Sequence, residues 1–209
     1  MDYGAVMTGA QFCNVSSEDG SISLNNLVPV ADSSIDTAYS IIIQLLDDAG
    51  STTDADYTWD GEKWTDTNTG AEVKDVTFGV GQGLWVYNFT GEDVKLQSAG
   101  QVITSDIDVP LSLDYGAVAV GNCFPVPVSL NDLVPLADEA VDTSYSVIIQ
   151  ILDDSGSTTD ADYTWDGEKW TNTNTGAEVA DVSFAAGQGL WVYNFTGELV
   201  NLRIPAPEL

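Results

Sequence analysis

Acidic residues at alternate positions are the part of this sequence whose type and spacing come nearest to a site for chemistry. They precede a glycine in the stretch STTDADYTWDGEKWT, which occurs at 51–65 and again at 157–171. Calcium binds carboxylate and carbonyl oxygens supplied by a turn, and we expect no other cofactor. The candidate calcium ligands are Asp54, Asp56, Asp60, Asp160, Asp162 and Asp166.

The calcium hypothesis has an ordinary alternative. If Asp56 is the first ligand, the twelfth position is Thr67, where an EF-hand loop needs a bidentate glutamate. No flanking helices are evident, and aspartate and glycine are also the usual residues of tight turns. The pattern therefore favours turn formation over a metal site.

Tryptophans in the same stretches suggest a second kind of site. Aromatic faces near Asp, Asn and Gln side chains suit a sugar platform, whose candidate residues are Trp59, Trp64, Trp165 and Trp170. The alternative is that these rings pack within a hairpin. Trp85 and Trp191 lie in apolar strand patterns, and we expect both in the core.

Catalytic signatures are missing from the sequence. Histidine is absent, which excludes Ser-His-Asp and Cys-His nucleophile systems and any histidine-based metal site. The glycines at 79–83 and 187–189 precede strands rather than helices, so they cannot form a phosphate loop. A carboxylate pair of the glycosidase type is compositionally possible, but 33 acidic residues will place some pair together by chance. We expect the protein not to be an enzyme.

The charge balance excludes two classes of partner. The net charge is -28, from 33 acidic and five basic residues. Nucleic acids and anionic membranes both require clustered Lys and Arg, so neither is an expected partner. The N-terminal stretch lacks a basic region followed by a long apolar segment, so we expect synthesis in the cytoplasm without a secretory signal.

A tandem repeat organises the chain. Residues 24–92 align with residues 130–198 at a constant offset of 106, and GQGLWVYNFTGE recurs unchanged at 81–92 and 187–198. A duplicated unit of about 100 residues is the size of an ordinary domain. We therefore predict a first β repeat unit at 1–100 (unit 1) and a second at 101–209 (unit 2).

The elements that must position the candidate residues are strands. The run at 39–46 is apolar on both faces and rich in β-branched residues, which is typical of a central strand. The stretch at 84–89 places Trp85, Tyr87 and Phe89 on one face of a strand. Gly81 and Gly83 just before it indicate a bulge or a close backbone approach. The predicted fold class is all-β, with two tandem antiparallel β-sandwich or barrel-like domains.

The repeated WDGEKW stretch predicts a β-hairpin. A two-residue type II′ turn that begins at Gly61 places Trp59 opposite Trp64 and Asp60 opposite Lys63. A type I′ turn is the competing register, and it would shift the partner of Trp64 by two residues. In either register the two lysines of the repeated stretches are hairpin residues.

One difference between the units predicts an assembly surface. Unit 2 has an extra segment at 101–113 before the shared Asp-Tyr-Gly-Ala-Val motif, and unit 1 begins at Met1 without it. Unit 1 would then lack one strand, and an unpaired sheet edge invites pairing with another chain unless the loop at 10–20 covers it. We therefore expect a homo-oligomer or docking to a protein assembly partner.

The motifs SLNDLVP, ILDDSG, YTW and FAAGQGLWVYN, with the closing segment at 202–209, also suggest a family. The chain resembles tandem GQGLWV-type β repeat modules of phage virion decoration proteins and of unannotated gut-bacterial surface proteins. The resemblance covers both units and carries no catalytic residues. It implies a virion surface or decoration protein, or a bacterial surface module.

Two functions therefore remain open at the level of sequence. The first is a non-catalytic structural protein of a larger assembly, such as a phage capsid, made in the host cytoplasm and located in the virion with a capsid protein as partner. The second is a glycan- or calcium-binding module of a bacterial surface protein. The first would use the edge of unit 1, and the second would use the tryptophan hairpins and the acidic turns.

Overall fold

The computed structural model describes residues 4–8, 12–13, 21–46, 52–111, 116–152 and 158–207. Residues 4–8, 12–13, 52–55 and 158–160 are described by their backbone alone. Within these ranges the regular elements are strands and two short 3-10 helices, so the all-β prediction is confirmed. No helix in the described ranges is long and apolar enough to cross a membrane.

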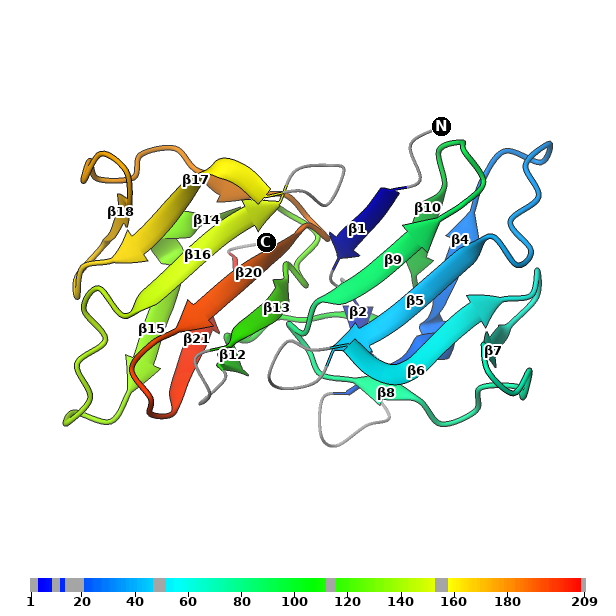
Figure 1. The fold of residues 1–209 in the computed structure, drawn as a ribbon, viewed down its shortest axis with the longest axis horizontal. Coiled ribbons are helices and arrows are strands. Elements are labelled where there is room, and N and C mark those ends of the chain that lie inside the picture. The colour runs from blue at the N-terminus through cyan, green and yellow to red at the C-terminus, as the bar shows by residue number, and fades with distance from the viewer. Residues whose placement is uncertain are drawn as a thin grey trace.

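Unit 1 contains ten strands and one 3-10 helix in its described part (Figure 1). They are β1 (Gly4–Thr8), β2 (Phe12–Cys13), β3 (Ile22–Ser23), η1 (Leu24–Asn26), β4 (Leu27–Val30), β5 (Ile41–Leu46), β6 (Thr52–Trp59), β7 (Trp64–Asp66), β8 (Thr77–Phe78), β9 (Leu84–Asn88) and β10 (Lys95–Ser98).

The remaining elements follow Gln101. They are β11 (Gln101–Val102), β12 (Ile107–Pro110), β13 (Ala117–Gly121), β14 (Val128–Ser129), η2 (Leu130–Asp132), β15 (Val134–Ala137), β16 (Val147–Leu152), β17 (Thr158–Trp165), β18 (Trp170–Asn172), β19 (Ser183–Phe184), β20 (Gly189–Asn194) and β21 (Val200–Ile204). The short β11 pairs back with β2 near the start of the chain.

A five-stranded antiparallel sheet forms the larger layer of each unit. Its strand order is β1-β9-β5-β6-β7 in unit 1 and β13-β20-β16-β17-β18 in unit 2. Strands at equivalent positions of the sequence repeat occupy equivalent positions in the two sheets. Figure 1 shows these sheets side by side in the front layer, with β4 and β10 behind one and β12, β15 and β21 behind the other.

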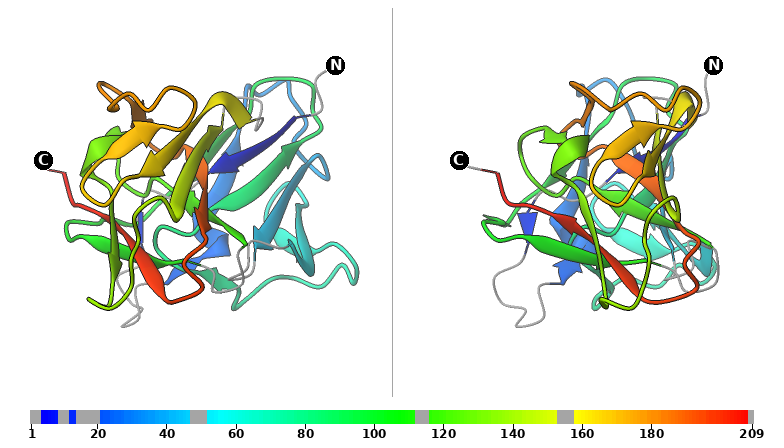
Figure 2. Two further views of the ribbon diagram at one scale, coloured as in Figure 1. Left: turned by 60° about the vertical axis from the view of Figure 1, so that its left-hand side comes forward. Right: turned by 90° about the vertical axis from the view of Figure 1, so that its left-hand side faces the viewer.

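A hydrophobic core fills the space between the two layers of each unit. In unit 2 its largest fully buried side chains are Trp170, Phe124 and Phe184, and Trp64 is the largest in unit 1. The side view in Figure 2 shows the red β21 in the layer opposite the yellow β16–β17 hairpin. Val80 packs against both cores, so the apolar interior continues from one unit toward the other.

The smaller layers of the two units differ by one strand. In unit 2, β21 lies between β12 and β15, whereas its counterpart β10 pairs only with β4 in the described part of unit 1. Leu202 of β21 is fully buried, but the equivalent Leu96 of β10 is only half-buried. Arg203 ties β21 to β12 through two hydrogen bonds of 2.8 Å to Asp108. Within the loop at 10–20, named as a possible cover for this edge, residues 12–13 form β2 and pair with β11, while residues 10–11 and 14–20 lie outside the described residues.

Backbone hydrogen bonds join the two units directly. The N–H of Gly83 donates to Ala119 O at 2.9 Å, and the N–H of Gly121 donates to Gly81 O at 2.8 Å. A Cβ on Gly83 would lie 2.8 Å from the Cβ of Ala119, and one on Gly81 would lie 2.6 Å from Val109. The predicted close backbone approach at Gly81 and Gly83 is confirmed, and its partner is the other unit.

Candidate functional site

The four hairpin tryptophans are buried, which corrects the prediction that they form a sugar platform. Trp64 and Trp170 have no exposed surface, and Trp59 and Trp165 are 6% exposed. The two rings of each hairpin meet edge to face with centroids 5.4 Å apart. The indole N–H of Trp64 donates to Leu27 O at 2.7 Å, and Trp170 makes the equivalent bond in unit 2. The rings therefore tie each hairpin to the opposite layer and offer no face to a ligand.

The hairpin register is the first of the two predicted alternatives. Trp59 pairs with Trp64, and Trp165 pairs with Trp170. Gly61 has a φ of +107°. This backbone conformation is strained for residues with a Cβ atom, but glycine adopts it readily. The type II′ prediction is therefore confirmed for the strand pairing.

Asp60 lies opposite Lys63, as the register predicts, and the N–H of Asp60 donates to Lys63 O at 3.0 Å, but the ion pair of the lysine is made with another residue. Lys63 Nζ lies 3.2 Å from Glu72 Oε2, and Lys169 makes the same contact at 2.8 Å in unit 2. Asp60 Oδ1 instead accepts hydrogen bonds from the backbone N–H groups of Glu62 and Lys63. These backbone donors lower the pKa of Asp60, which caps its own turn.

The six candidate calcium ligands do not form one described cluster. Asp60 and Asp166 each cap a hairpin turn, and Asp162 Oδ1 accepts from Gln150 Nε2 at 2.9 Å. The side chains of Asp54 and Asp160 lie outside the described residues. Where side chains are described, no three acidic or thiol groups lie close enough to hold a metal ion. Calcium binding stays a prediction.

A different set of residues forms the best candidate site. We call the side of the two five-stranded sheets that faces away from the cores the outer face, and Figure 1 looks onto it. Side chains of a strand alternate between the core and the outer face. In β5, Ile41 and Ile43 are buried in the core, while Ile42 and Gln44 are partly exposed on the outer face. Its aromatic, amide and isoleucine members are Ile42, Gln44, Trp85, Tyr87, Phe89, Ile148, Gln150, Trp191, Tyr193 and Phe195.

Two equivalent tryptophans meet at the centre of the outer face. The rings of Trp85 and Trp191 have centroids 6.0 Å apart and planes tilted by 59°. They pack against the small cluster of Leu46, Leu152 and Ala119. Each ring is only partly buried, so the prediction that both belong to the core is wrong. They line the junction between the units and retain exposed surface.

Stacked aromatic pairs continue the outer face along each strand. Tyr87 and Phe89 stack with centroids 6.1 Å apart and planes within 4° of parallel. Tyr193 and Phe195 repeat the arrangement at 5.9 Å and 7°. Phe89 is 43% exposed and Phe195 is 42% exposed. Each strand therefore presents a row of three aromatic side chains to solvent.

Amide and carboxylate groups run beside the aromatic rows. The hydroxyl of Tyr87 donates to Gln44 Oε1 at 2.8 Å, and the hydroxyl of Tyr193 donates to Gln150 Oε1 at 2.9 Å. Gln150 in turn donates to Asp162. Burial, and then the charge of Asp162, raises the pKa of Tyr193, so its hydroxyl stays protonated at neutral pH. The groups beside the rings are thus hydrogen-bonding and fixed in direction.

No positive charge belongs to this set of residues. Lys63, Lys169 and Arg203 are each neutralised by an ion pair with an acidic side chain, and Lys95 lies on β10 in the other layer. An anionic ligand would meet no cation among the named residues and would be repelled by the net charge of -28. The chemistry of the outer face suits an uncharged ligand with both apolar faces and hydroxyl groups.

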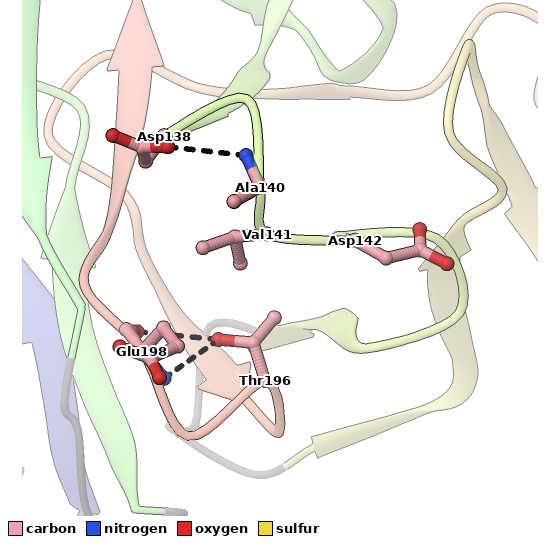
Figure 3. A pocket seen from close by; sticks show the side chains of 6 residues that line it. All are labelled: Asp138, Ala140, Val141, Asp142, Thr196 and Glu198. Atoms are coloured by element: carbon pink, nitrogen blue, oxygen red, sulfur yellow. Dashed lines mark hydrogen bonds between the residues drawn. The ribbon is translucent and has the colours of Figure 1, made fainter.

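A depression in unit 2 is another candidate site and carries less chemistry. It has a volume of about 610 Å³ and is lined by Asp138, Ala140, Val141, Asp142, Thr196 and Glu198 (Figure 3). Asp138 Oδ1 accepts from the N–H of Ala140, and Asp142 Oδ1 accepts from the N–H of Ser144. These two carboxylates cap their own turns, so they are already engaged by backbone N–H groups.

Comparison of the chain with protein-family models, curated proteins and solved structures finds no match. A functional assignment therefore has to come from the chemistry of the molecule's own surfaces.

The period-2 aromatic stripe was visible in the sequence, but which of its two possible sides faces solvent depends on the packing of the second layer.

Proposed function

We propose that the protein is a non-catalytic module that binds uncharged carbohydrate on its outer face. The observation that carries the proposal is the symmetric row of partly exposed aromatic rings on β9 and β20, which meets at the Trp85–Trp191 pair. A module of this kind would act at a bacterial surface, where such glycans are displayed or captured.

Sugar chemistry matches the composition of this face. A pyranose ring has an apolar face of C–H groups and a rim of hydroxyls, so it binds to a surface that combines aromatic rings with planar hydrogen-bonding groups. Aromatic side chains supply large contact area with little conformational entropy to lose. Gln44 and Gln150 supply both donors and acceptors beside the rings. Few polar groups among many apolar ones is the usual composition of a small-molecule site.

No reaction is part of the proposal. The protein has no histidine, and Asp162, a carboxylate beside the aromatic rows, already accepts a hydrogen bond from Gln150. Glycoside hydrolysis needs two carboxyl groups on opposite sides of the scissile bond. The rows instead offer stacking surface, which supports retention of a glycan and not its cleavage.

Affinity gel electrophoresis tests the proposal. The protein is run through gels that contain soluble β-glucan, xylan, mannan or no polysaccharide. We expect at least one neutral polysaccharide to retard it, and the paired change Tyr87→Ala and Tyr193→Ala to weaken retardation about tenfold or more, as for an aromatic hot spot. The matched control is Val28→Ala with Val30→Ala, because these valines are exposed on β4 in the other layer. Equal mobility in all gels would contradict the proposal.

A second function has a specific observation in its favour. β10 pairs only with β4 in the described part of unit 1, while its counterpart β21 has a strand on each side. Leu96 is correspondingly less buried than Leu202. This supports the proposal of a structural protein that docks an extended segment of a partner on β10, as a phage virion or decoration protein would do in a homo-oligomer or on a capsid protein.

A further inference from the structure

We infer that the two units form one composite binding site, and that its ligand is an extended neutral glycan chain lying across the junction between them. The inference rests on the proposed function and goes beyond it, because two tandem modules would otherwise carry two independent sites. Its basis is that equivalent residues of the two units touch each other on the outer face.

The central contact is between equivalent residues. Trp85 and Trp191 occupy the same position of the repeat and have ring centroids 6.0 Å apart. Leu46 and Leu152 are also equivalent and share their cluster. Contact of a residue with its own equivalent is the mark of a two-fold relation. The tryptophan pair therefore lies at or beside a local two-fold axis, and neither half of it is complete without the other unit.

The aromatic rows extend outward from this centre. Figure 1 shows β9 and β20 running in opposite directions, each starting at the junction and ending toward its own end of the molecule. Alternate residues of a strand are about 7 Å apart, so each row from tryptophan to phenylalanine covers roughly 13 Å. Both rows with the central pair therefore form a site much longer than one sugar ring.

The junction is fixed by backbone contacts rather than by flexible side chains. Gly83 donates to Ala119 O at 2.9 Å, and Gly121 donates to Gly81 O at 2.8 Å. There is no space at Gly83 for even one methyl group. A pre-organised pair of rows loses little entropy when a chain binds across both, which makes each added sugar contact more effective.

The two-fold relation also indicates how the glycan is recognised. A glycan chain has a reducing and a non-reducing end, so two rows related by a two-fold axis meet the chain in opposite polarities. Stacking on aromatic faces tolerates either polarity, whereas a fixed set of hydrogen bonds to hydroxyls does not. The outer face should therefore select an extended, neutral chain by shape and stacking.

Isothermal titration calorimetry with the full chain tests this inference. The probes are β-1,4-linked gluco-, xylo- and manno-oligosaccharides of three and six residues. We expect the six-residue chain of the bound series to bind about tenfold or more tighter than the three-residue chain. We also expect one six-residue chain per protein molecule.

Two glycine variants give the matched comparison. Gly83→Ala places a methyl group against Ala119, while Gly79→Ala in the same loop meets no atom closer than 3.7 Å. We expect Gly83→Ala to lose the advantage of the longer chain and keep the three-residue affinity, and Gly79→Ala to behave as the parent. The wild-type length series does not depend on how well either variant folds.

Three results would overturn the inference. They are equal affinity for both chain lengths, two six-residue chains bound per molecule, or a folded Gly83→Ala variant that keeps the full length dependence. In each of these cases the proposed carbohydrate binding would still stand. Absence of binding by every neutral oligosaccharide and polysaccharide would overturn the proposed function as well.

Discussion

Tryptophan serves two different purposes in this protein, and the environment of each residue decides which. Trp64 and Trp170 have no exposed surface and satisfy their indole N–H groups on carbonyl oxygens of the opposite layer. A buried N–H without an acceptor would be costly, so this bond fixes where the ring can sit. Trp85 and Trp191 lie at the junction between the units and keep part of their surface exposed.

The Asp108–Arg203 pair gives a prediction at the residue scale. Hydrogen bonding from Arg203 lowers the pKa of Asp108 in the folded state below its usual 3.8. A carboxyl group with a depressed folded pKa stabilises the protein above its unfolded pKa, and this stabilisation is lost as pH falls through the folded pKa. Both side chains are about 40% exposed, so the pair contributes at most about 1 kcal/mol.

Urea denaturation of the parent and of Asp108→Asn at two pH values checks this prediction. At pH 7 we expect the variant to have a lower free energy of unfolding, by up to about 1 kcal/mol. As the pH falls through the folded pKa of Asp108, which lies below 3.8, we expect the difference to shrink toward zero, because protonated Asp108 no longer carries the charge that asparagine lacks. A difference of the same size at both pH values would contradict the assignment.

At the scale of elements, the two smaller layers differ in how well they cover their central leucine. Leu202 is opposite Val109 of β12 and is fully buried, while Leu96 has no such strand beside it in the described part of unit 1. We expect Leu202→Ala to lower the free energy of unfolding by about 2 to 5 kcal/mol and Leu96→Ala by clearly less.

Chemical denaturation with a matched analysis of both variants measures this difference. The two leucines occupy equivalent positions of the repeat. The comparison of the two variants therefore measures the effect of the neighbouring strand that covers Leu202 and not Leu96. Equal losses would mean that another part of the chain already covers β10. That outcome would remove the edge on which docking to an assembly partner is proposed.

The elements also show what could be predicted from sequence and what could not. The strand at 39–46 followed from its run of apolar, β-branched residues, and the Trp59–Trp64 pairing followed from a turn that begins at Gly61; both are local signals. The Lys63–Glu72 pair could not be predicted in this way, because it depends on where the chain returns after the hairpin. The side on which Trp85 lies also depends on a second layer that is distant in sequence.

At the scale of the whole molecule, equivalent strands of the two repeat units together form one outer face that spans both units. The sequence predicted two units and a close approach at Gly81 and Gly83, but not that this approach would be made by the other unit. The sequence also placed the candidate sugar platform on the hairpin tryptophans, whose rings are buried. The exposed tryptophans lie on β9 and β20, each separated from its hairpin by one strand, where equivalent residues of the two units meet.

The six tryptophans make the central claim directly measurable. Four of them are at most 6% exposed, and the other two lie on the outer face at the junction. Intrinsic tryptophan fluorescence should therefore report ligand binding through Trp85 and Trp191. The variant that carries Trp85→Phe and Trp191→Phe keeps aromatic rings there and removes the reporter.

The measurement is a fluorescence titration of both proteins with the neutral polysaccharide that retards the parent most strongly in the gel. The account predicts a saturable change in emission for the parent and almost none for the double variant, whose remaining tryptophans are buried. A change of equal size in the double variant, or none in the parent while the polysaccharide binds, would place the binding site away from the outer face.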